Sequence, residues 1–175
     1  MVFRKCPISL VRQRHDRLCG SLMILLCYDG SEDARAAIEH AGELLGGQPA
    51  TVLTVWEPFM EVLARSSFGV GATVGMVNID EIDAANRKGA ESRAEEGAEL
   101  ARHAGLNAQP HTRTQVTSVA AAILDEASEL EAAAIVVGSR GLTGVKSLLL
   151  GSVSHAVIQH ADRTVIVVPS EGSSA

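Results

Sequence analysis

Aromatic side chains are scarce in this sequence, which has one tryptophan, one tyrosine and three phenylalanines among 175 residues. A core built from large rings is therefore excluded. Hydrophobic residues still make up 46% of the chain, so the core must consist mainly of Ala, Val, Leu and Ile. This mixture is typical of helices packed on a buried parallel sheet. The length suits one well-buried core, and we expect one domain.

Long apolar runs and paired cysteines are also lacking. No stretch approaches the roughly 20 apolar residues of a transmembrane helix, so no membrane partner is expected. The three cysteines, Cys6, Cys19 and Cys27, form no C-x-x-C pair, and Cys27 lies in an apolar run typical of a buried strand. Such cysteines indicate a reducing compartment, and we predict a cytoplasmic protein. The six histidines are scattered, so no metal site is predicted.

Positive charge is concentrated at the N-terminus. The first 21 residues carry a formal charge of +4, whereas the whole chain carries −6, so the remainder carries −10. An acidic body argues against nucleic acid or an anionic membrane as the main partner. We expect residues 1–21 to be a basic, disordered extension, residues 22–169 to form the domain, and residues 170–175 to be a frayed tail.

Apolar runs of strand length alternate with helical patterns along the domain. This alternation predicts an α/β fold with an open, mostly parallel sheet and right-handed crossovers. The expected strands are residues 23–28, 50–55, 111–116, 134–137 and 164–168, and the expected helices are 32–45, 80–104, 120–130 and 152–160.

One connection, residues 56–78, is unusually long for a compact domain. It contains three of the five aromatic residues, Trp56, Phe59 and Phe68. The segment can therefore be a lid or a surface for a partner. A variable loop with a short helix near Glu61 fits the same residues equally well.

A glycine-rich segment, Val136 to Ser154, leaves the fourth strand and ends at the start of a helix. Gly138 and Gly141 let backbone N–H groups approach phosphate oxygens, and Gly151 and Ser152 bring the free N–H groups of a helix N-terminus. The hydroxyls of Ser152 and Ser154 can add donors, and Arg140 and Lys146 can offset negative charge. No G-x-x-x-x-G-K-[ST] sequence occurs, so the segment is not a P-loop.

The spacing of Gly138, Gly141 and the pair Gly151-Ser152 is G-2x-G-9x-G-S, which resembles the nucleotide loop of the ATP-binding universal stress proteins. The resemblance extends to M-I-L-L-C-Y-D-G-S near the first strand, T-V-L-T-V in the second, I-V-V-G-S-R-G in the fourth and T-V-I-V-V-P in the fifth. It covers roughly residues 22–169. It implies a Rossmann-like fold, in which an open five-stranded parallel sheet of strand order 3-2-1-4-5 has helices on both faces and its ligand at the carboxyl edge.

The resemblance also implies a site for ATP or AMP, together with Mg²⁺. Asp29 would contact the adenosine, and Cys27, Val55 and Val137 would line or adjoin the adenine pocket. The ribose and phosphate cradle would comprise Gly138, Arg140, Gly141, Gly151, Ser152, Val153 and Ser154. Simpler structural roles remain open for several of these residues: Asp29 as a helix cap, Val55 and Val137 as core, and Ser154 as a first-turn residue.

The function that follows is regulation in a stress response through nucleotide occupancy. The family resemblance suggests a homodimer, paired through the last strand, and an unidentified regulatory protein partner. A slow ATPase or autophosphorylating enzyme is the first alternative, although no general base or carboxylate cluster for a metal is evident near the loop. A protein of this fold that binds partners but no nucleotide is the second.

Overall fold

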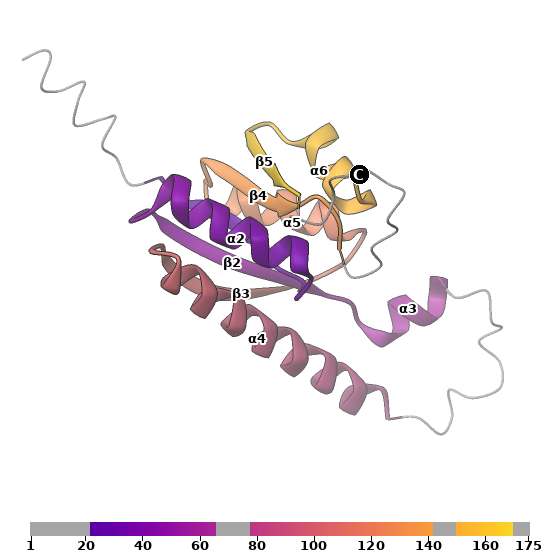
Figure 1. Ribbon diagram of the computed structural model, residues 1–175. Coiled ribbons are helices and arrows are strands. Elements are labelled where there is room, and N and C mark those ends of the chain that lie inside the picture. Colours follow the sequence, from indigo (N-terminus) through magenta and orange to yellow (C-terminus); the bar gives the residue numbers. More distant parts are fainter. Residues whose placement is uncertain (1–21, 66–77, 142–149, 170–175) are drawn as a thin grey trace, which may run out of the picture.

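The computed structural model describes residues 22–65, 78–141 and 150–169. Five parallel strands form one sheet in the order β3-β2-β1-β4-β5 (Figure 1), which confirms the predicted fold and strand order. The expectations for residues 1–21 and 170–175, and for the middle of the glycine-rich segment, lie outside the described residues. The strands are β1 Ile24–Cys27, β2 Pro49–Trp56, β3 Asn107–Thr114, β4 Ala134–Gly138 and β5 Thr164–Val168.

The predicted bounds of the third strand were wrong. β3 begins at Asn107, four residues before the predicted start, and pairs with β2 along its whole length. Asn107 and Pro110 are poor strand formers, which hid this part of the strand from a propensity argument. An edge strand such as β3 tolerates proline because one of its sides has no partner strand.

Helices cover both faces of the sheet (Figure 1). One face packs against α2 (Glu32–Leu45) and α4 (Ile79–His103), and the other against α5 (Val119–Glu129) and α6 (Ser152–His160). Strand β1 shows the alternation: Ile24 and Leu26 are buried on the α2 and α4 side, and Leu25 on the α5 and α6 side. The central strand is thus apolar on both faces, as parallel sheets require.

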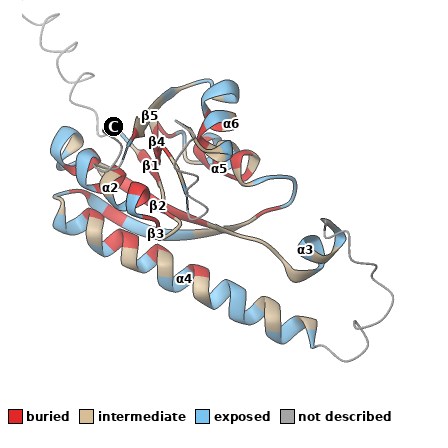
Figure 2. Ribbon diagram, turned by 45° about the vertical axis from the view of Figure 1, so that its right-hand side comes forward, coloured by how far each residue is buried: buried red, intermediate tan, exposed pale blue. Residues whose placement is uncertain are grey.

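Small residues let the helices approach closely. A methyl group on Gly42 would lie 2.3 Å from the carbonyl oxygen of Ala104, and one on Gly97 would lie 2.8 Å from the ring of Tyr28. Alanines make the buried stripe of α4, which occupies the C-terminal part of that helix, while its N-terminal part is mostly exposed (Figure 2). The scarcity of aromatic residues thus reflects close packing of helices against the sheet.

The long connection after β2 contains helix α3 (Phe59–Arg65), which confirms the short helix expected near Glu61. This helix packs against α4. Residues 66–77 lie outside the described part of the chain, so the lid or partner surface stays a prediction. Among the residues that the structure describes, no helix is long and apolar enough to cross a membrane.

Candidate functional site

A cavity of about 310 Å³ opens at the carboxyl ends of β1 and β4. The two strands are neighbours in the sheet, and the chain leaves them toward opposite faces, which is where α/β sheets hold ligands. All eleven site residues named from the sequence line this cavity: Cys27, Asp29, Val55, Val137, Gly138, Arg140, Gly141, Gly151, Ser152, Val153 and Ser154. Six others also line it, namely Tyr28, Ala34, Leu53, Arg93, Val119 and Ile123.

One part of the cavity is apolar. Leu53 and Val55 come from β2, Val137 from β4, and Val119 and Ile123 from α5. Burial, with a smaller effect of the Asp29 charge, raises the pKa of the Cys27 thiol to about 12, so Cys27 is neutral at physiological pH and acts as a small apolar side chain. This part of the cavity suits a flat, uncharged ring.

Another part of the cavity is formed by the N-terminus of α6. The helix begins at Ser152, and its N-cap, Gly151, has extended backbone geometry. The N–H groups of the first turn have no partner within a helix, and together with the helix dipole they favour an anion. The Gly151 N–H, which precedes this turn, donates to the carbonyl oxygen of Ser139 at 2.7 Å and so is not free for a ligand. This hydrogen bond joins the start of α6 to the end of β4.

Ser154 has a structural partner. Its hydroxyl donates to the carbonyl oxygen of Gly138 at 2.7 Å, and the residue is buried. In this arrangement the hydroxyl proton is not directed at a ligand, although the sequence suggested a donor to phosphate. Ser154 holds α6 against β4, whereas Ser152 is exposed at the helix start.

Asp33 also belongs to this framework, although no motif in the sequence indicated it. Its buried carboxylate accepts hydrogen bonds from the Ser139 hydroxyl at 2.7 Å and from the Arg140 backbone N–H at 2.9 Å. Arg140 Nε lies 3.4 Å from the same oxygen. Arg140 therefore offsets the charge of Asp33, and its positive charge is not fully available to a ligand. In the sequence, Asp33 was recognisable only as an acidic residue in the first turn of a helix. Acidic residues are common at that position on surface helices as well, so this did not indicate a role in the site.

The glycines of the segment have different surroundings. A methyl group on Gly138 would lie 2.7 Å from the carbonyl carbon of Asp33 and 2.9 Å from the backbone nitrogen of Ala34, so the start of α2 excludes any side chain there. A methyl group on Gly141 would lie 2.7 Å from Asp29 Oδ2. Gly138 is thus required by helix packing, whereas Gly141 leaves room for the Asp29 carboxylate.

Asp29 braces the turn between β1 and α2. Its Oδ1 accepts from the Ser31 N–H at 2.9 Å, while the helix itself is capped by Ser31, whose hydroxyl accepts from the Ala34 N–H at 3.2 Å. The suggestion that Asp29 caps the helix was therefore wrong, because Ser31 is the cap. The other oxygen of Asp29 faces Gly141 across the cavity wall.

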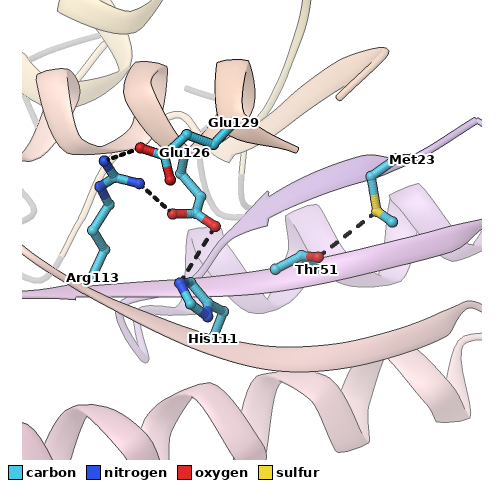
Figure 3. Close-up of polar contacts among 6 residues, drawn as sticks. All are labelled: Met23, Thr51, His111, Arg113, Glu126 and Glu129. Atoms are coloured by element: carbon cyan, nitrogen blue, oxygen red, sulfur yellow. Dashed lines mark hydrogen bonds and ion pairs between the residues drawn. The ribbon is translucent and has the colours of Figure 1, made fainter. Parts of the chain in front are cut away.

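A polar cluster fixes α5, which supplies the wall residues Val119 and Ile123. Buried Glu126 accepts from Arg113 Nη1 at 2.7 Å and lies 3.4 Å from His111 Nε2 (Figure 3). Arg113 Nη2 donates to Glu129 at 2.6 Å. These two hydrogen bonds raise the pKa of Arg113, and the bond from Arg113 lowers the pKa of Glu129. Because Arg113 is the register partner of Val55, the cluster ties α5 to the strand edge beside the cavity.

Charged side chains on the cavity wall are few. Among the residues that the structure describes, Asp29 is the one carboxylate that lines it, and Arg93 and Arg140 are the two cations. No group of three His, Cys, Asp or Glu side chains able to hold a metal ion occurs in the described ranges. The wall therefore offers donors for an anion and an apolar surface for a ring.

Comparisons with known structures show the same fold. A solved structure of the hypothetical protein MJ0577 superposes with a TM-score of 0.69 and 23% identity, covering 87% of this chain and 99% of that one. A universal stress protein in complex with cAMP gives 0.59 and 22%, covering 86% and 98%. The universal stress protein of Archaeoglobus fulgidus in complex with dAMP gives 0.57 and 23%, covering 84% and 97%.

Sequence comparisons identify the family. The model of the universal stress protein family matches residues 23–169. The chain is 33% identical over 145 residues to the universal stress protein YxiE of Bacillus subtilis (strain 168), covering 83% of this chain and 97% of that protein. It is 32% identical over 147 residues to a universal stress protein of Thermus aquaticus, encoded in the QAH/OAS sulfhydrylase 3′ region, covering 83% and 96%. The chain belongs to the universal stress protein family.

Proposed function

We propose that this protein binds an adenine nucleotide, ATP or AMP, in the cavity between β1 and β4 and acts as a regulatory module. One observation carries the proposal: the eleven site residues that the family resemblance implied all line a single cavity. That cavity is apolar in one part and rich in N–H donors in another. The structures of relatives with cAMP and dAMP support the choice of an adenine nucleotide.

In this proposal residues 22–169 form the binding domain. The adenine ring lies against Cys27, Val55 and Val137, and the sugar lies beside Asp29. The phosphate lies on the N–H groups of Ser152, Val153 and Ser154 at the start of α6. Mg²⁺, where present, is held mainly by phosphate oxygens and water, which is how proteins commonly bind it with nucleotides.

A regulatory role is favoured over ATP hydrolysis because the described cavity wall offers few side chains that could act as a general base. Asp29 is the one carboxylate on the described wall, and it already accepts a hydrogen bond from the Ser31 N–H. A general base would have to reach an attacking water directly. Slow ATP hydrolysis or autophosphorylation is the competing proposal, and a Ser152→Asp variant that hydrolyses ATP at the wild-type rate would place such activity elsewhere.

A homodimer paired through β5 is part of the proposal. β5 is an edge strand, and Val165, Ile166 and Val167 on it are only partly buried. An apolar edge of this kind can add a strand from a second copy. Sedimentation at micromolar concentration should give a dimer, and a monomer there would remove this part of the proposal. A cytoplasmic location and a protein partner remain expectations of the same proposal.

The proposal is tested first on the protein as isolated. The purified protein is denatured, and any released small molecule is identified by chromatography and mass. Bound ATP or AMP is the expected result. A protein that is empty and also fails to bind added ATP, AMP or Mg²⁺-ATP by calorimetry would contradict the proposal and favour a role in partner binding alone.

Ser152→Asp tests the phosphate end specifically. A carboxylate at the first residue of α6 suits the helix dipole, so the fold should be at least as stable as the wild type. The same carboxylate repels a phosphate at this helix start, and nucleotide affinity should fall about tenfold or more, ~1.4 kcal/mol. Gln159→Glu is the matched control because it adds one negative charge to an exposed position of α6 away from the cavity. Equal affinities in both variants would contradict the assigned phosphate position.

A further inference from the structure

Arg93 lines the cavity from α4, which contributes no other residue to its wall. Neither the glycine spacing nor the strand ends pointed to it. A methyl group on Gly30 would lie 3.7 Å from Arg93 Cδ, and one on Gly89 would lie 3.5 Å from Arg93 Nη2. The side chain therefore runs between the turn after β1 and its own helix, in space that two glycines leave open.

Arg93 differs from the other arginines in its bonding. Within the described residues it forms no ion pair and donates no hydrogen bond to the protein. Every other arginine whose side chain is described has an acidic partner: Arg35 with Glu96, Arg87 with Glu91, Arg102 with Glu95, Arg113 with Glu126 and Glu129, Arg140 with Asp33, and Arg163 with Asp162. An unpaired cation is unusual in a chain of formal charge −6.

The acidic residue closest to Arg93 along the same face of α4, Glu96, already has hydrogen-bond partners. Glu96, three residues further along α4, accepts hydrogen bonds from Arg35 and, at 3.0 Å, from the Tyr28 hydroxyl. The positions four residues before and after Arg93 are both glycine, Gly89 and Gly97. Arg93 thus has no intrahelical carboxylate to neutralise it, and its charge is directed to the cavity.

The position of Asp29 separates Arg93 from the phosphate end. Gly30, beside Arg93, follows Asp29 directly in the chain, and the Asp29 carboxylate faces Gly141. A ligand whose first phosphate lies on α6 and whose sugar lies at Asp29 would present a further group toward Arg93. A guanidinium binds phosphate with charge-assisted, often bidentate, hydrogen bonds, so a second phosphate matches this wall best.

We propose that Arg93 binds a second phosphate group of the nucleotide and so sets the preference for doubly or multiply phosphorylated ligands over AMP. This inference rests on the proposed function. Two sources of that phosphate share the chemistry: the outer part of a 5′-polyphosphate chain, as in ATP, or a phosphate on the sugar, as in adenosine 3′,5′-bisphosphate. The ligand series below separates them.

The test compares AMP, ATP and adenosine 3′,5′-bisphosphate by calorimetry on the nucleotide-free protein. The wild type should bind ATP or the bisphosphate about tenfold or more tightly than AMP, and the ligand with the advantage identifies the source of the phosphate. Arg93→Gln should reduce that advantage to about threefold or less while changing AMP affinity little. Arg93→Lys should keep part of it, because the charge stays but the planar fork is lost.

Arg87→Gln is the matched control. It removes the same charge from the same helix, at an exposed position whose partner is Glu91 and which lies outside the cavity wall. Its ligand preference should equal that of the wild type, which excludes a general effect of net charge. A thermal melt of each nucleotide-free variant checks the fold.

The outcomes separate the two proposals. A wild type that binds none of the three ligands, with or without Mg²⁺, overturns the proposed function, and this inference with it. Binding by the wild type without any advantage for a second phosphate, or an advantage that survives in Arg93→Gln, overturns only the role of Arg93.

Discussion

Replacing Gly138 with alanine should destabilise the fold itself, before any ligand is considered. The new Cβ would lie 2.7 Å from the carbonyl carbon of Asp33 and 2.9 Å from the Ala34 backbone nitrogen. Both neighbours are backbone atoms at the start of α2, so neither can move without shifting the helix. Overpacking of this kind costs about 1–3 kcal/mol. For a domain of this size, each kcal/mol lowers the melting temperature by roughly 2–4 °C.

Gly151→Ala is the internal comparison for this prediction. Its new Cβ would lie 3.3 Å from the Ser139 carbonyl oxygen and 3.4 Å from the Arg140 Cα, a tight fit that small adjustments can relieve. The backbone of Gly151, at φ −71° and ψ 161°, suits any residue. Alanine there also restricts the unfolded chain, which offsets about 0.4–1 kcal/mol. The net change in the free energy of unfolding should stay within about 1 kcal/mol.

The assay is thermal and urea unfolding of the nucleotide-free protein, followed by far-ultraviolet circular dichroism. Gly138→Ala should melt roughly 2–12 °C below the wild type, with Gly151→Ala close to the wild type. Two variants of equal stability would refute the reasoning, because it assigns the first glycine to helix packing. If the order holds, a loss of nucleotide binding in Gly138→Ala cannot be read as the loss of a ligand contact.

Further predictions concern the cavity wall and the cluster beside it. Because its pKa is about 12, compared with an ordinary value of 9.0, Cys27 should react with iodoacetamide at pH 8 roughly a thousandfold more slowly in the folded protein than after unfolding, as mapped by mass spectrometry. The bond from Arg113 lowers the pKa of Glu129 from 4.5, so the stabilisation it gives is present above that pH and is lost as the pH falls through the lower folded value. In Glu129→Gln the free energy of unfolding should therefore fall less steeply as the pH is lowered. A fall as steep as that of the wild type would contradict this. Ser154→Ala should lower the free energy of unfolding by about 1–2 kcal/mol in urea titrations, since it leaves the Gly138 carbonyl without its donor.

The overall fold was readable from the sequence because its signals are local. The apolar run of β1 is soon followed by Asp29 and that of β4 ends at Gly138, and the glycine-rich segment adds a spacing that resembles the nucleotide loop of a known family. The third strand was the exception. Its first half contains Asn107 and Pro110, and only pairing with β2 makes it a strand. Tertiary contact overrode local propensity there.

Most of the residues that line the cavity could be predicted from the sequence, but some of the side chains that surround and hold that lining could not. The glycine spacing and the strand sequences carry the family resemblance, and that resemblance named these wall residues. The roles of Asp33 and Arg93 are visible only in the folded protein. Asp33 accepts hydrogen bonds from residues more than 100 positions away, and Arg93 extends from α4 to the turn at Gly30. A single sequence gives no spacing rule for such contacts. That Ser31 rather than Asp29 caps α2, and that the Ser154 hydroxyl donates to Gly138, is seen only in the hydrogen bonds of the folded protein.

The segments that form the cavity wall are held in place by hydrogen bonds within the protein, which we call the supports of the cavity. These hydrogen bonds form without a ligand. Asp33 holds the start of the glycine-rich segment through Ser139 and Arg140, and Ser154 and Gly151 hold the start of α6 against the end of β4. A ligand that binds as proposed would therefore meet two walls that are already in place, and little ordering of these walls would oppose its binding. A variant that breaks a support should weaken every nucleotide to a similar degree. A variant of a group proposed to contact the ligand, such as Arg93, should instead change the preference among nucleotides. Affinity and preference measured together thus distinguish a support from a contact.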